Sequence, residues 1–163
     1  MKRPLVFAMT AAFGVILAAC GGGGTSSSGT SPSASSSPSA SASASSTLTV
    51  KTASLGQFIA DGSGKTLYLF EADKTTQSTC SGACAGAWPP FTASGSVTAS
   101  SGVNQSKVGT TTRSDGNKQV TYNGHPLYYF IGDVSAGDTN GQGKNAFGAE
   151  WYVVSPSGDK IEK

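Results

Sequence analysis

The chain has 163 residues, of which 37% are hydrophobic and 12% are charged, and its formal net charge at pH 7 is +2. A charge this small offers no basic patch of the kind that binds nucleic acid, so no nucleic-acid partner is expected. The chain has one histidine and three cysteines, and a zinc site built on that histidine and a disulfide-bonded cysteine pair is not expected.

The first twenty residues have the pattern of an export signal. Lys2 and Arg3 precede an apolar run over residues 5–19, which has the length of a signal-peptide core and is too short to span a bilayer. Residues 17–20, Leu-Ala-Ala-Cys, resemble the bacterial lipobox, which implies cleavage before Cys20 and attachment of a diacylglyceryl group to its sulfur. We therefore predict a signal peptide over residues 1–19 and a mature chain anchored to the cell membrane through lipid on Cys20.

Residues 21–46 contain only Gly, Ser, Thr, Ala and Pro. Such a segment cannot bury enough apolar surface to offset the entropy lost on ordering. We predict a disordered tether over residues 20–46, with a reach on the order of 30 Å. Residues 47–163 then have the length of a single domain.

Strand and turn signals dominate after residue 47, and no window has the apolar spacing of a helix. Strands are predicted over residues 47–52, 55–60, 66–70, 119–122, 126–130 and 151–154, with an edge strand at 108–113. Residues 61–64 and Asn123-Gly124 are predicted turns of two hairpins. Residues 94–106 read as a surface loop, and 134–148 as a Gly- and Asp-rich connection. The expected fold is a small all-β domain.

Both hairpins carry the pattern G-x-x-L-Y-x-F-x-x-D, which begins at Gly64 and again at Gly124, 60 residues later. Repetition at this level indicates one supersecondary unit used twice. The alternation of a strand places Leu67 and Leu69 on one face and Tyr68 and Phe70 on the other. Each copy is followed by a tryptophan, at positions 88 and 151.

The repeat-motif residues are Tyr68, Phe70, Asp73, Tyr128, Phe130 and Asp133. We interpret the motif mainly as the second strand of a hairpin that ends at an aspartate. That aspartate either caps backbone amides in the turn that follows, which we favour, or ligates a cation.

The motif resembles that of a family of bacterial predicted lipoproteins built from a secreted repeat, Y-x-[FWY]-x-x-D. Three further segments look like the same family: Cys80-x-x-x-Cys84 with Trp-Pro-Pro at 88–90, Gln-Val-Thr-Tyr-Asn-Gly at 119–124, and Gly-Asp-Thr at 137–139. The resemblance covers about residues 56–158. It implies an extracytoplasmic location and a repeat architecture. The family has no established biochemical role, so the resemblance implies no activity.

Cys80 and Cys84 form an even pair once Cys20 carries lipid, and an oxidising compartment favours a disulfide between them. A bridge this short would stabilise the fold by about 2 kcal/mol. A redox or metal-binding pair is the alternative, although the four-residue spacing is not that of the thioredoxin motif.

Asp138, Asn140 and Gln142 offer the oxygen ligands of a calcium loop, with Gly143 in its sixth position. The twelfth position holds Ala149 and no flanking helices are predicted, so an EF-hand is not expected. A looser cation site stays as a weak candidate. His125, the one histidine, is expected to be exposed in the second hairpin turn without a role.

Most of the aromatic side chains are expected to form the core. They are Tyr68, Phe70, Trp88, Phe91, Tyr122, Tyr128, Tyr129, Phe130, Trp151 and Tyr152. We expect a membrane-anchored extracytoplasmic lipoprotein, with a non-enzymatic domain that binds an envelope protein or small ligand and needs no cofactor. An extracytoplasmic redox or metal-associated protein is the alternative.

Overall fold

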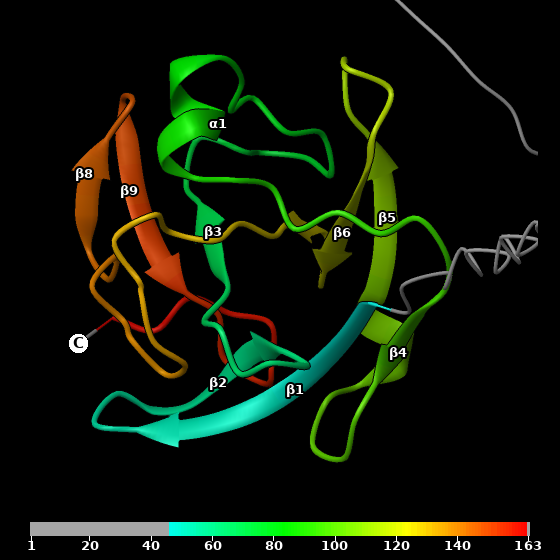
Figure 1. Cartoon of the computed structure of the whole chain (residues 1–163), viewed down its shortest axis with the longest axis vertical. Helices are drawn as coiled ribbons and strands as arrows, with labels where there is room; N and C mark the ends of the chain where they lie inside the picture. Colours follow the sequence, from blue (N-terminus) through cyan, green and yellow to red (C-terminus); the bar gives the residue numbers. More distant parts are fainter. Residues whose placement is uncertain (1–45, 163) are drawn as a thin grey trace, which may run out of the picture. The chain divides into compact units, whose positions relative to one another are not determined.

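The computed structural model describes residues 46–162 (Figure 1). The predicted signal peptide, Cys20 and the predicted tether up to residue 45 therefore lie outside the described residues. The elements in chain order are β1 (Ser46–Ala53), β2 (Gly56–Asp61), β3 (Tyr68–Phe70), α1 (Ala83–Ala87), β4 (Val97–Ala99), the 3-10 helix η1 (Gln105–Lys107), β5 (Val108–Thr112), β6 (Lys118–Tyr122), β7 (His125–Pro126), β8 (Lys144–Ala146) and β9 (Ala149–Val153).

The strands form three small sheets, with the orders β2-β1-β4, β3-β9-β8 and β5-β6-β7. All neighbours are antiparallel except β1 and β4, which run parallel. The expectation of an all-β domain is confirmed. Within residues 46–162, no helix is long and apolar enough to cross a membrane.

Two tight turns set the hairpins of this fold. In the first, the Asp61 carboxylate accepts hydrogen bonds from the backbone N–H groups of Ser63 and Lys65, each at 2.9 Å. In the second, Asn123 and Gly124 both have positive φ, at 51° and 87°. A type I′ turn needs this conformation at both positions, and Asn-Gly adopts it most readily.

The two predicted returning strands are shorter in the structure than in the sequence prediction. Residues 66–67 still bond to β2, through an Ala60–Thr66 bridge and a 3.1 Å bond from the Leu67 N–H to the Ile59 carbonyl. The chain then leaves β2, and β3 pairs with β9 instead. In the second copy, β7 covers only residues 125–126. The hairpin prediction is correct at the turn and wrong for the tyrosine end of each strand, because that end pairs with distant parts of the chain.

Four short elements were not predicted, and the 3-10 helix η1 is one of them. β4 lies in the expected loop 94–106, and β8 lies in the connection 134–148. Each has three residues and depends on a long-range partner, which local sequence does not reveal. The helix α1 has five residues rich in Ala and Gly, and the Trp88 N–H closes it by donating to the Cys84 carbonyl at 2.7 Å.

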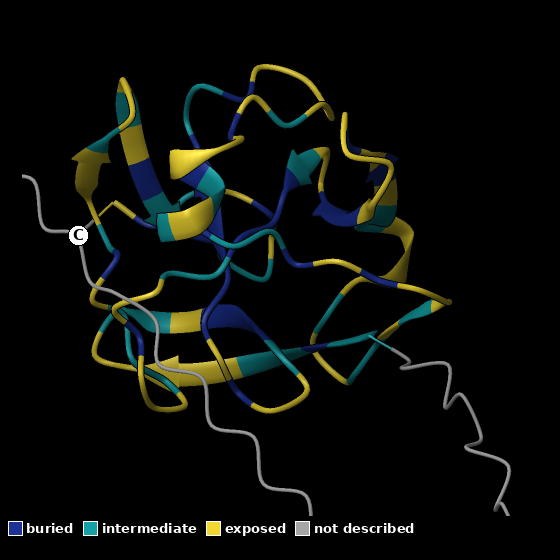
Figure 2. Ribbon diagram, turned by 45° about the horizontal axis from the view of Figure 1, so that its top comes forward, coloured by how far each residue is buried: buried dark blue, intermediate teal, exposed yellow. Residues whose placement is uncertain are grey.

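The core has two clusters of buried side chains, one on each side of the motif strands. Tyr68 and Phe70 lie in one cluster with the tryptophans, and Leu67 and Leu69 lie in the other. The predicted division of faces is thus correct. Figure 2 shows buried residues in the middle of the domain, and exposed residues at the turns and on β8.

Candidate functional site

The two copies of the motif meet at their first tyrosines. The Tyr68 N–H donates to the Tyr128 carbonyl at 2.9 Å, and the Tyr128 N–H donates to the Tyr68 carbonyl at 3.0 Å. Two residues that exchange both hydrogen bonds stand directly opposite each other, with side chains on the same face. This isolated bridge joins two segments that are 60 residues apart in the sequence.

Each tyrosine reaches the aspartate of the other copy. The Tyr68 hydroxyl donates to Asp133 Oδ2 at 2.5 Å, and the Tyr128 hydroxyl donates to Asp73 Oδ2 at 2.6 Å. We call Tyr68–Asp133 and Tyr128–Asp73 the reciprocal pairs. Both tyrosines are fully buried and both aspartates are 5% exposed. The repeated motif therefore acts across the two copies.

The environment keeps the two tyrosines protonated. Burial, and then the hydrogen bond to the Asp133 carboxylate, raises the pKa of Tyr68 far above its usual range. Burial and the bond to Asp73 raise the pKa of Tyr128 in the same way. A neutral phenol that faces a carboxylate is a hydrogen-bond donor, and these two stay donors at any physiological pH.

The second oxygen of each aspartate holds the loop that follows. Asp73 Oδ1 accepts from the N–H and hydroxyl of Thr79, at 2.7 and 2.6 Å. Asp133 Oδ1 accepts from the Asn140 N–H at 2.9 Å. The aspartates thus cap amides six and seven residues on, beyond the adjacent turn. Burial raises the pKa of Asp133 although Tyr68 and Asn140 both donate to it.

Four aromatic rings from alternating copies stack beside the reciprocal pairs. The order of this ring stack is Phe70, Trp151, Trp88, Phe130, with centroids 4.1, 4.0 and 4.4 Å apart. Both tryptophans are buried, at 1% exposure or less. Interleaved rings add about 0.5–1.5 kcal/mol per pair beyond the area they bury. The ring stack therefore stabilises the packing of the two copies against each other.

A disulfide joins Cys80 to Cys84 in the first copy. Beside it, the buried Arg113 donates to the Cys80 carbonyl at 2.6 Å and to Ser78 Oγ at 2.7 Å. Ser78 Oγ also lies 2.6 Å from the Tyr128 hydroxyl, whose single proton is donated to Asp73. This network ties the cysteine loop to one reciprocal pair.

The three weak cation candidates bond to separate backbone segments. Asp138 Oδ2 accepts from the N–H groups of residues 134 and 135. The Asn140 amide donates to the Gly132 carbonyl, and the Gln142 amide accepts from Val153 N–H and donates to the Ile161 carbonyl. Within residues 46–162, no three His, Cys, Asp or Glu side chains are grouped so as to hold a metal.

His125 begins β7 and is partly buried. It lines a shallow hollow of about 250 Å³ together with Asp73, Lys74, Thr75, Thr76, Asn123 and Gly124. The Asp73 carboxylate in this wall is already used by Tyr128 and Thr79. The Asp73 carboxylate is therefore not free to bind a ligand in this hollow.

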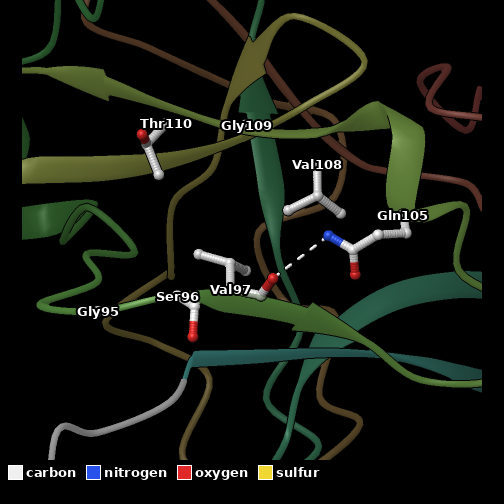
Figure 3. Close-up of a pocket in the computed structure, with 7 residues that line it drawn as sticks. All are labelled: Gly95, Ser96, Val97, Gln105, Val108, Gly109 and Thr110. Atoms are coloured by element: carbon white, nitrogen blue, oxygen red, sulfur yellow. Dashed lines mark hydrogen bonds between the residues drawn. The ribbon is translucent and has the colours of Figure 1, made fainter.

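A second hollow of about 250 Å³ lies between β4 and β5 (Figure 3). Its lining is Gly95, Ser96, Val97, Gln105, Val108, Gly109 and Thr110. We call it the β4–β5 hollow. The sequence prediction missed it because residues 94–106 read as a polar loop. The β-forming Val-Thr at 97–98 within that loop was the one available signal.

Comparison with known proteins finds one family. A family model described as a secreted repeat of unknown function matches residues 49–92 and 109–155. Each matched segment contains one copy of the motif and one tryptophan of the ring stack. A secreted family implies that the domain is extracytoplasmic. No curated protein and no solved structure matches the chain.

Proposed function

The chain belongs to the family of secreted repeats of unknown function, and on that basis we propose that it is a membrane-anchored extracytoplasmic lipoprotein. In this proposal its folded part is a non-enzymatic domain that binds an envelope protein or a small ligand. The lipid on Cys20 supplies the contact with the membrane.

The use of the motif side chains is the observation that carries the proposal. Tyr68, Tyr128, Asp73 and Asp133 are the polar groups that the repeat places twice, and all four are buried. Their hydroxyls and carboxylates bond to each other and to loop amides. Among the described residues, no buried side-chain N or O lacks a hydrogen-bond partner. The motif therefore supports the fold, and partners are left to the surface.

The anchor is tested by following lipid on the full chain in a bacterial host. The intact chain is expected to incorporate labelled palmitate and to fractionate with membranes. Cys20→Ser should lose the label and leave the membrane fraction, because the thioether to the diacylglyceryl group cannot form. A Cys20→Ser chain that keeps both properties would refute the lipid assignment.

The binding function is tested by photo-cross-linking the lipidated chain to its neighbours in intact cells. We expect a reproducible cross-linked partner. Addition of unlabelled full-length chain should reduce its cross-linking by competition. The opposite result would be enzymatic turnover of a substrate in a broad hydrolase and oxidoreductase panel. That turnover would have to disappear in Tyr128→Phe or Asp133→Asn while the variant stays folded. That result would make the motif catalytic and overturn the proposal.

The exposure and bonding of the two cysteines bear on the redox or metal alternative. Cys80 is 1% exposed and Cys84 is 7% exposed. Reactive cysteines are partly exposed thiolates in electropositive surroundings, whereas this pair is bridged and buried. We therefore propose a structural role for the bridge. Bound metal or a visible absorption band in protein purified from its own membrane would support the alternative instead.

A further inference from the structure

β5 is an end strand of its sheet, and one of its edges is open. The Lys107 carbonyl accepts from the Asn123 N–H, and the Arg113 N–H donates to the Asn117 carbonyl, both at 2.9 Å. Antiparallel hydrogen bonding alternates along a strand, so the odd-numbered residues of β5 bond to β6. Both backbone groups of Thr110 therefore point away from β6. Within residues 46–162, no strand is hydrogen-bonded to β5 on that side, and β4 lies across the hollow that Figure 3 shows.

The neighbouring edge of β4 is guarded by a side chain. Gln105 Oε1 accepts from the Ala99 N–H at 2.8 Å, and Gln105 Nε2 donates to the Val97 carbonyl at 3.3 Å (Figure 3). The amide thus stands where a neighbouring strand would bond. Proteins usually blunt exposed edges in such ways, or with lysine and proline. β5, with the sequence Val-Gly-Thr-Thr-Thr, contains no such guard.

The first repeat shows that this position accepts a strand. β1 holds in the first copy the place that β5 holds in the second, because each pairs with the strand that leads into the motif. The registers Val50–Ile59 and Thr110–Val120 make Leu48 the equivalent of Val108. The Leu48 carbonyl accepts from the Ser100 N–H at 2.9 Å, and β4 lies along that edge of β1. The equivalent edge of β5 has no such strand among the described residues.

The β4–β5 hollow beside this edge is large enough for one large side chain. Its volume of about 250 Å³ is below the roughly 300–1,000 Å³ of small-molecule sites. No lining residue is charged. A charged side chain placed there would lose water without gaining a partner, which is unfavourable.

We propose that the open edge of β5 binds an extended peptide segment of an envelope partner as an added strand, with an uncharged side chain of that segment in the β4–β5 hollow. This inference rests on the proposed binding function and names its partner class. The Val108 N–H already donates to the Gln105 carbonyl. Main-chain hydrogen bonds to the Val108 carbonyl, Thr110 and Thr112 therefore give the affinity, and the hollow gives the selectivity.

The test uses the full lipidated chain in detergent micelles and a displayed library of random eight-residue peptides. Selected peptides should be poor in charged residues. One of them, made synthetically, should slow amide hydrogen exchange of Thr110 and Thr112 at least tenfold. Thr110→Pro, which lacks the N–H, should weaken binding at least tenfold. Thr52→Ala, at an exposed threonine of β1 that belongs neither to this edge nor to the hollow, is the control and should bind normally.

A second variant acts from the opposite wall. Ser96 is exposed and lies outside β5, so Ser96→Trp should fill the hollow and also weaken binding without touching the edge. This variant decides the test if Thr110→Pro does not fold. Peptide binding that survives in folded Thr110→Pro or in folded Ser96→Trp overturns the inference. So does dimerisation of the full chain through this edge, seen by analytical ultracentrifugation, because the occupant would then be a second copy.

The outcome also separates this inference from the function on which it rests. A cross-linked envelope partner that is still captured by Ser96→Trp, with no peptide selected, refutes the β5 site and leaves the binding function standing. Absence of both a partner and a peptide overturns both.

Discussion

Removal of the Tyr128 hydroxyl should destabilise the domain more than the loss of one exposed polar atom would. In Tyr128→Phe, Asp73 Oδ2 loses a donor at 2.6 Å, and Ser78 Oγ loses its contact with the hydroxyl at 2.6 Å. A hydrogen bond to a charged group contributes about 1.5–3 kcal/mol, and a buried carboxylate left short of donors cannot recover that from water. We expect the free energy of unfolding to fall by about 2–3 kcal/mol.

The assay is equilibrium unfolding of the full chain in guanidinium chloride, followed by tryptophan fluorescence and circular dichroism. Tyr152→Phe is the matched control. Its hydroxyl donates to Glu150 on the surface, and such a loss should stay within about 0.5 kcal/mol. Equal stabilities for Tyr128→Phe and Tyr152→Phe would refute the argument that the buried pair holds the fold.

Three further changes have defined outcomes. Burial raises the pKa of Asp61, but the hydrogen bonds from Ser63, Lys65 and Tyr129 outweigh this effect, so the net pKa is lowered. The contribution of the Asp61 carboxylate to stability is therefore present above about pH 4 and lost as the pH falls. Asp61→Asn should make stability less dependent on pH in acid unfolding measured by circular dichroism. Gly141→Ala should lower the melting temperature, because its Cβ would come within 2.8 Å of the Trp88 ring, whereas Gly86→Ala meets nothing within 4 Å and should not. Reduction of the disulfide should cost about 2 kcal/mol in urea unfolding, and a reduced chain as stable as the oxidised one would contradict its structural role.

The hairpin turns and the faces of the strands were predictable from local sequence. Asn123-Gly124 can adopt the two positive φ angles that a two-residue turn needs. Alternation along a strand fixes which side chains share a face, and it placed Leu67 and Tyr68 in different core clusters. Both rules act within a few residues, so no knowledge of distant parts of the chain was required.

The partners of the motif residues were not predictable in the same way. Alternation tells which face Tyr68 occupies but not which strand lies opposite. β9 lies on one side of Tyr68, and the segment after β7 that carries Tyr128 lies on the other; the bond to Asp133 follows from the bridge between the two tyrosines. A twofold repeat in the sequence is equally consistent with pairs within each copy. Only the three-dimensional arrangement shows that the pairs are exchanged.

The β4–β5 hollow was hidden for a related reason. β4 has three residues and forms because Leu48 and its neighbours offer an open edge to the segment 97–99. The hollow is then bounded by that strand, by Gln105 and by β5. Its walls come together through pairing with β1, about fifty residues earlier, which composition does not encode.

The most direct measurement of how the repeat works is a pair of double-mutant cycles on the free energy of unfolding, with Tyr128→Phe combined first with Asp73→Asn and then with Asp133→Asn. The exchanged arrangement predicts a coupling energy of about 1–2 kcal/mol for Tyr128 with Asp73 and less than about 0.5 kcal/mol for Tyr128 with Asp133. Strong coupling of Tyr128 to Asp133 and none to Asp73 would show that each motif acts within its own copy, and would contradict the account.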